Sequence, residues 1–210
     1  MTIQDAYSRY EIMPQLSLHM RRVAGVGKLI LDGWREPIGH DTVMRTLLLH
    51  DMGNIVKFDL TEAGQRKLKS AEPEDLPRWR DIQAKYWKAY GKSAYEATLA
   101  IVKELHQEDL VEIYQADHEG YAKSYPALLL DQSPTVQILA YCDVRVVPSG
   151  VVPMKERIAD LQRRYGRDLS WYDFLYQLEE SVGAMTTTPL FSITEQSVTP
   201  FLPSLLQYPL

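Results

Sequence analysis

A histidine and an aspartate stand side by side at His50 and Asp51, directly after three leucines in the stretch LLLHDMGN. Burying either group without a partner costs free energy, so their place beside an apolar run needs a chemical reason. Counting in helical steps of three and four puts His50 on the apolar row of Leu47. The same count puts Asp51 on the adjacent row, with Leu48. We therefore expect both side chains to flank the buried side of one helix.

Two more ionisable residues fall on apolar rows of other predicted helices. His19 continues the row of Leu16, and Asp143 continues the row of Ala140. A lone histidine on such a row is usually a hydrogen-bonded core residue. Two imidazoles and two carboxylates together, however, can share a divalent cation and compensate its charge. We therefore predict a metal site with four ligands: His19, His50, Asp51 and Asp143.

Mixed nitrogen and oxygen ligands narrow the choice of metal. Imidazole and carboxylate donors suit Mn, Fe, Co, Ni or Zn better than calcium, and Mg is a further candidate. A cation with open coordination positions lowers the pKa of bound water and polarises a phosphoryl oxygen. The sequence does not choose among these metals.

The order of the four residues resembles the H…HD…D signature of the HD-domain superfamily of metal-dependent phosphohydrolases. The resemblance covers roughly residues 12–165 and includes the stretches HDMGN, YCDVRVVPSGVV and ERIADLQRRYG. It implies an all-α fold, an HD-domain-like helical bundle with the metal site in its core. It also implies that a metal-activated water attacks a phosphate ester, with Asp51 as a catalytic residue as well as a ligand.

Residues near the signature are candidates for binding the phosphate. Many members of the superfamily have lysine three residues after the motif aspartate, where this chain has Asn54, and Lys57 lies one turn further on. Arg22 follows His19 by three residues, so it could present its guanidinium to a phosphate beside the metal. An arginine on the solvated surface is an equal alternative for Arg22.

His118 is the last candidate for the site. It lies on the row of Val111 and Tyr114, which we expect to face inward. Superfamily members with two metals add two histidines before the final aspartate, but the segment SAYEAT has Tyr95 where the first is expected. We therefore favour a site with one metal, in which His118 is a substrate contact or a catalytic proton donor. The alternative is that His118 is a ligand of a second metal.

Other chemistries lack the residues they require. The stretch AGVGKL is not a phosphate-binding loop, because the G-x-x-x-x-G-K-[ST] spacing puts Arg22 at the first glycine and Leu29 at the Ser/Thr position. Gly25 and Gly27 are better explained by close helix packing. No G-x-S-x-G motif occurs, and the single cysteine, Cys142, excludes an internal disulfide and a multi-cysteine zinc site.

Composition bounds the class of protein. The chain has 210 residues, of which 45% are hydrophobic and 24% charged, as expected for a folded domain. No stretch approaches the ~20 apolar residues of a membrane helix and no signal peptide is evident, so we expect a cytoplasmic protein without a membrane partner. A net charge of −5 argues against binding to duplex nucleic acid.

Helical patterns dominate the chain, and no convincing strand alternation occurs. We predict one helical domain over residues 1–183 and a C-terminal tail, 184–210, rich in proline and apolar residues. The tail is expected to pack on the domain or on a partner subunit, which makes a homodimer a candidate. The sequence predicts helices over the following ranges: 6–33, 41–57, 77–90, 93–105, 108–122, 133–147, 153–166 and 170–183.

Two functions are therefore open. The first is a metal-dependent phosphohydrolase, a phosphomonoesterase or phosphodiesterase acting on a nucleotide or a similar small phosphate ester. The second is a non-catalytic HD module that binds a metal or a nucleotide as a sensor. The complete ligand set favours the enzyme, because a binding module has no chemical need for all four residues.

Overall fold

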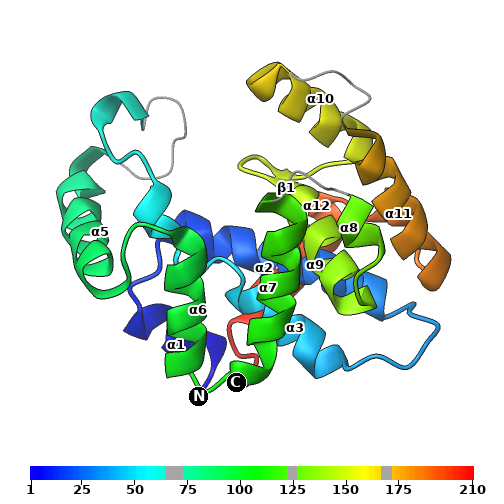
Figure 1. Ribbon diagram of the computed structural model, residues 1–210, viewed down its shortest axis with the longest axis horizontal. Coiled ribbons are helices and arrows are strands. Elements are labelled where there is room, and N and C mark those ends of the chain that lie inside the picture. Colours follow the sequence, from blue (N-terminus) through cyan, green and yellow to red (C-terminus); the bar gives the residue numbers. More distant parts are fainter. Residues whose placement is uncertain (65–72, 123–126, 167–171) are drawn as a thin grey trace.

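The computed structural model describes residues 1–64, 73–122, 127–166 and 172–210, and these residues are mostly helical (Figure 1). This confirms the prediction of an all-α protein. The only strands among the described residues are β1 (Val146–Val147) and β2 (Gly150–Val151), which pair antiparallel with Val146 opposite Val151. The same residues contain no helix that is both long and apolar enough to cross a membrane.

Twelve α-helices and a 3₁₀ turn, η1, position the residues discussed below. Their bounds are α1 (Ile3–Arg9), α2 (Pro14–Leu31), α3 (His40–Leu49), η1 (Asn54–Lys57), α5 (Leu76–Tyr90), α6 (Ala94–Glu104), α7 (Val111–Ala122), α8 (Ala127–Leu130), α9 (Pro134–Val144), α10 (Met154–Tyr165), α11 (Asp173–Met185), α12 (Glu195–Val198) and α13 (Leu202–Leu205).

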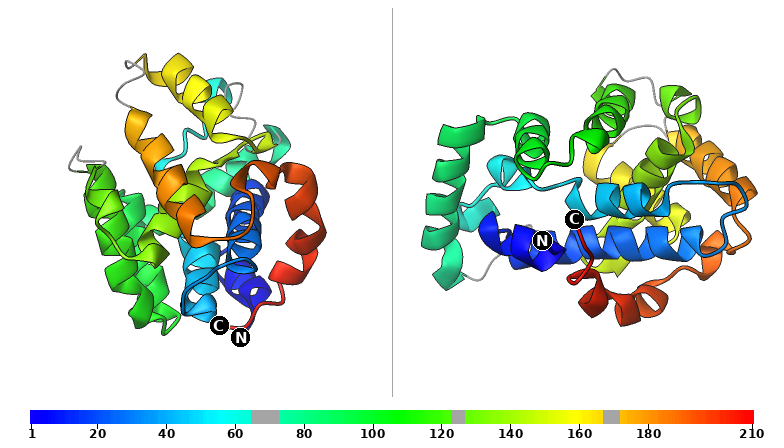
Figure 2. Two further views of the ribbon diagram at one scale, coloured as in Figure 1. Left: turned by 90° about the vertical axis from the view of Figure 1, so that its right-hand side faces the viewer. Right: turned by 90° about the horizontal axis from the view of Figure 1, so that it is seen from below.

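The buried helix α2 is the centre of the fold. In Figure 2, α3 lies along one side of it, and the C-terminal helices α12 and α13 lie along another. A Cβ atom on Gly27 would lie 2.1 Å from Leu47 Cδ1 of α3, and one on Gly25 would lie 2.4 Å from Val198 Cγ1 of α12. Both glycines therefore allow close helix packing, as the sequence indicated.

Three predicted helices are shorter than expected. The range 133–147 is helical only from Pro134 to Val144, and its last two residues form β1 instead. The range 6–33 is divided into α1 and α2 at Glu11, which has a left-handed φ of 47°, with Pro14 then starting α2. The range 41–57 is α-helical only to Leu49; Asp51 lies in the turn that follows, and the range ends in the 3₁₀ helix η1. The Gly53 N–H in this turn donates to Thr98 Oγ1 of α6 at 3.0 Å, a tertiary contact that local sequence does not reveal.

The C-terminal tail packs against its own domain. The N–H of Ile3 donates to the carbonyl of Tyr208 at 3.0 Å, and the N–H of Leu210 donates to the carbonyl of Met1 at 2.9 Å. The two termini consequently lie side by side (Figure 1). A homodimer stays a prediction from the sequence.

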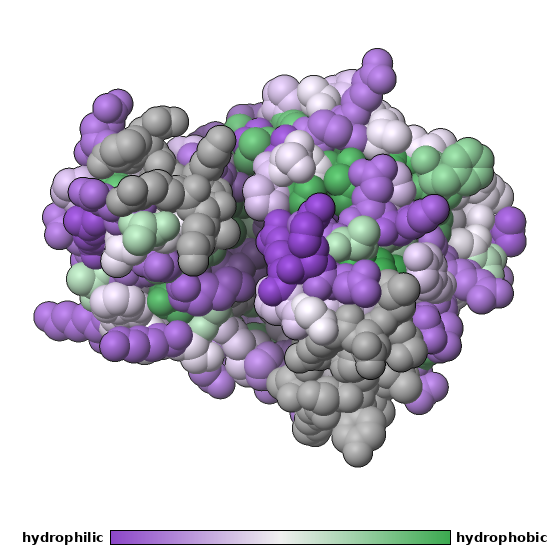
Figure 3. Space-filling model, turned by 90° about the horizontal axis from the view of Figure 1, so that it is seen from above, coloured by the Kyte–Doolittle hydropathy of each residue, from purple (hydrophilic) through white to green (hydrophobic). Residues whose placement is uncertain are grey.

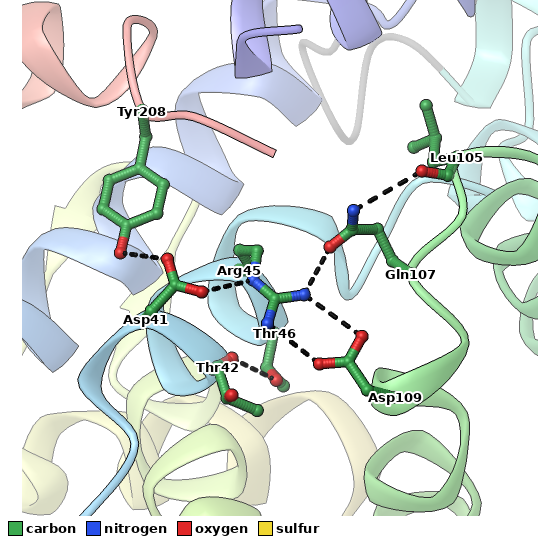
Figure 4. Close-up of polar contacts among 8 residues, drawn as sticks. All are labelled: Asp41, Thr42, Arg45, Thr46, Leu105, Gln107, Asp109 and Tyr208. Carbon is green, nitrogen blue, oxygen red and sulfur yellow. Dashed lines mark hydrogen bonds and ion pairs between the residues drawn. The ribbon is translucent and has the colours of Figure 1, made fainter.

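A polar network around Arg45 joins α3 to distant parts of the chain (Figure 4). Its guanidinium donates to Asp41 at 2.8 Å, to Asp109 at 2.9 Å and to the Gln107 side chain. Tyr208 donates its hydroxyl to Asp41 at 3.1 Å. The network therefore fixes the helix that precedes His50 against both the segment that leads into α7 and the C-terminal tail.

Candidate metal centre

Two histidines from different helices bring their ring nitrogens together. His19 lies on α2 and His50 immediately follows α3, and their Nε2 atoms are 3.3 Å apart. The Nδ1 of His50 lies 2.8 Å from the carbonyl oxygen of Leu47, which can only accept a hydrogen bond. Nδ1 therefore carries a proton, and in the neutral ring Nε2 keeps the lone pair that a metal requires.

Two carboxylates lie against the same nitrogens. Asp143, near the end of α9, has its Oδ1 3.0 Å from His19 Nε2 and 3.6 Å from His50 Nε2. The Oδ2 of Asp51 lies 3.5 Å and 3.7 Å from the same two atoms. Ligands about 2.1 Å from a tetrahedral metal lie about 3.4 Å from one another. The group of His19, His50 and Asp51 could hold a metal ion, and Asp143 Oδ1 lies within 3.6 Å of both Nε2 atoms of that group.

The pKa values follow from this crowding of charge. Burial lowers the pKa of His50, but Asp51 and Asp143 outweigh it and raise the pKa to about 9. Burial also works against the ionised form of Asp143, yet its hydrogen bonds to His19 and His50 hold the pKa of that carboxyl well below its usual range. A bound cation would displace the Nε2 proton of a protonated His50 ring, so metal binding should release a proton.

A third carboxylate, Asp117 on α7, was missed by the sequence analysis. Its Oδ1 is buried and has no hydrogen-bond partner among the described residues. Burial, with the charges of Asp143 and Asp51, raises its pKa to about 7. The signal was available, because Asp117 follows buried Tyr114 by three residues and therefore also continues its row.

Asp117→Asn is expected to stabilise the metal-free protein at pH 8. The pKa of Asp117 is about 7 in the folded protein, above the value of 3.8 in the unfolded chain, so the folded protein holds this proton more tightly. The contribution of Asp117 to the free energy of unfolding is therefore complete below pH 3.8 and is lost as the pH rises through 7. Asparagine has no charge to bury, so the gain should be roughly 1–4 kcal/mol at pH 8 and should shrink towards pH 4. Urea unfolding at both pH values measures it; an equal effect at both would contradict the assignment.

The predicted substrate contacts have different surroundings. Arg22 donates from Nε and Nη2 to Glu195 at 2.9 and 2.6 Å, so it is an ion-paired residue and not a solvated one. Asn54 is buried and lines a cavity that also exposes His19. Lys57 is exposed and lies outside the described lining of that cavity.

The expected inward position of His118 is wrong. Its side chain is exposed, and its ring stacks on Tyr95 of α6 with centroids 3.9 Å apart and planes 8° from parallel. Tyr114 and Asp117 of the same helix point inward instead of His118. Because an α-helix has 3.6 residues per turn, a row of residues spaced by three and four rotates slowly around the helix and does not face the core along its whole length.

The cavity beside the four residues has a volume of about 280 Å³. His19, Asp51 and Asn54 contribute to its polar wall, and Arg157 and Arg164 of α10, which sequence analysis did not select, also line it. The other lining residues are mainly apolar: Leu16, Leu18, Phe58, Val146, Val147 and Pro148. Figure 3 shows the face of the molecule that carries α10, where hydrophilic and hydrophobic side chains surround a hollow.

Comparison with protein-family models, curated proteins and solved structures gave no significant match.

Proposed function

We propose that the protein is a metal-dependent phosphohydrolase of the HD-domain type, which hydrolyses a phosphate ester of a nucleotide or a similar small molecule. The observation that carries this proposal is that Asp51 and Asp143 each have a carboxylate oxygen within 3.0–3.7 Å of the Nε2 atoms of both His19 and His50, beside a cavity that His19 and Asp51 line. A site with open space beside its ligands can admit both water and substrate.

The residues present fit a divalent cation, because two carboxylates and two histidines with inward Nε2 atoms provide a balanced donor set. Such a cation would lower the pKa of a water molecule at the site and would polarise a phosphoryl oxygen of the substrate. Asp51, which is 21% exposed and lines the cavity, would orient the attacking water by accepting a hydrogen bond. Asn54 would donate its side-chain amide to a phosphate oxygen from the same wall.

His118 and Lys57 are proposed as contacts to the outer part of the substrate. Both side chains are exposed, and the flat stack of His118 on Tyr95 presents an aromatic pair that a nucleobase could extend. We also propose His118 as the proton donor to the leaving group, the role expected for it from the sequence.

The ion pair between Arg22 and Glu195 is the observation that favours the alternative, a non-catalytic sensor. An anion entering the cavity could compete with Glu195 for Arg22 and so release the C-terminal segment that Glu195 begins. Such a module would bind the ligand without converting it. Turnover separates the two functions.

The test is phosphate release from a substrate panel with the metal varied. Nucleoside mono-, di- and triphosphates, cyclic dinucleotides and p-nitrophenyl phosphate would each be incubated with metal-free protein supplied with Mn, Fe, Co, Ni, Zn or Mg. We expect at least one combination to turn over many times per chain, and a chelator to stop the reaction. Binding without turnover across the panel would favour the sensor.

A further inference from the structure

The helix α10 carries a cluster of three arginines around one carboxylate. Arg157 Nη1 lies 3.1 Å and Arg164 Nε 2.9 Å from the same oxygen of Asp160, its Oδ2. Arg163 Nη2 lies 3.0 Å from the other oxygen, Oδ1. Three positive charges therefore share one negative charge, an excess of two positive charges in a chain whose net charge is −5.

At least one hydrogen-bond donor of these three arginines has no partner among the described residues. Arg157 is only 17% exposed, and its buried Nε has no hydrogen-bond partner among the residues that the structure describes. Leaving a buried charged donor unpaired costs free energy, and a guanidinium that is poorly solvated in this way gains more from pairing its other N–H groups with an anionic ligand. Arg22, on the same cavity, differs because its Nε and Nη2 already donate to Glu195. The cationic surplus at the cavity therefore belongs to α10.

The spacing along α10 points two of the arginines at the cavity. Arg157 and Arg164 are seven residues apart, two turns of one helix face, and both line the cavity that His19 and Asp51 also line. Arg163 is 75% exposed and is not part of the described lining. An apolar wall that includes Phe58 completes the same cavity. One ligand could thus meet the metal centre and the arginines at once.

We propose that Arg157 and Arg164 bind a second phosphoryl group of the substrate, one that is not hydrolysed. A guanidinium group donates two parallel hydrogen bonds to phosphoryl oxygens. A phosphoryl group, with its several oxygens, therefore suits a pair of arginines better than an anion with a single charge would. The substrate class is then an organic compound with two phosphoryl groups, such as a nucleoside diphosphate or bisphosphate. This inference rests on the proposed function, because it assigns the other phosphoryl group to the metal centre.

Calorimetric titration of inorganic pyrophosphate into metal-free protein tests the anion site without catalysis. We expect Arg157→Gln and Arg164→Gln each to weaken binding about tenfold, the effect of losing a charge-assisted hydrogen bond. Arg163→Gln is the matched control, because it removes the same charge and likewise an ion pair to Asp160, but outside the cavity, and it should change the dissociation constant less than about twofold. Arg164 is 42% exposed, so its variant should fold even if Arg157→Gln does not.

Kinetics with adenosine 5′-monophosphate and adenosine 3′,5′-bisphosphate complete the test. The preference for the bisphosphate, as a ratio of kcat/KM, should fall about tenfold in Arg164→Gln and stay constant in Arg163→Gln. Equal pyrophosphate binding by all variants, or none by the wild type at millimolar concentration, would overturn the inference. Arginine-dependent binding without hydrolysis of any phosphate ester would instead reject the proposed function and leave the anion site standing.

Discussion

Asp51→Ala is expected to abolish stoichiometric metal binding and, with it, phosphate release. Asp51 supplies one of the two carboxylates at the centre, and its Oδ2 lies 3.5 Å from His19 Nε2. Loss of a group that only orients a ligand typically costs about 10–100-fold in metal affinity or activity, so loss of a ligand should cost more than about 100-fold in both. Elemental analysis of protein purified without chelator should find about one divalent ion per wild-type chain and far less in the variant.

The matched control is Asp32→Ala. Asp32 is the residue after α2, 53% exposed, and forms an ion pair with Lys28 at 2.9 Å. Its replacement removes the same charge from the protein but should leave the metal content unchanged, since exposed pairs contribute little. Full metal occupancy in Asp51→Ala, or equal losses in both variants, would show that the four residues are not a metal centre.

Arg145→Met is expected to destabilise the protein by roughly 3–5 kcal/mol, because several buried acceptors would lose their donor. Arg145 is completely buried. Its guanidinium donates to the carbonyls of Leu190 at 3.3 Å and Ile193 at 2.8 Å, and also to the carbonyl of Val152 and the hydroxyl of Tyr141. These contacts join the end of α9, which carries Asp143, to the residue after β2 and to the segment between α11 and α12.

Urea unfolding monitored by circular dichroism measures the effect, and Arg163→Met provides the control because that arginine is 75% exposed. The control should change the free energy of unfolding by less than about 1 kcal/mol. A similar small change in Arg145→Met would mean that the buried guanidinium contributes no more than a surface one.

The candidate centre was predictable because its residues follow helical rows. His19 and Asp143 lie on α2 and α9, so counting in steps of three and four placed them beside apolar neighbours that are buried in the structure. Asp51 reaches the centre in a different way, from the turn after α3. Its inward direction depends on the turn that Gly53 makes against α6, a contact between distant segments.

The other parts of the site depend on tertiary contacts that no local pattern reveals. Glu195 lies 173 residues after Arg22 in the chain, so the ion pair between them could not be read from neighbouring positions. Arg157 and Arg164 belong to a helix whose charged face is typical of a solvated surface, and only the placement of α10 over the cavity gives them a different role. The exposed position of His118 likewise results from how α7 packs on α6.

A crystal structure of manganese-loaded protein tests the metal centre most directly, because anomalous scattering locates the ion without reference to activity. We predict one strong peak within about 2.3 Å of the Nε2 atoms of His19 and His50 and of a carboxylate oxygen from each of Asp51 and Asp143. The absence of a peak among these four residues at saturating manganese, or an ion bound only elsewhere on the protein, would contradict the account.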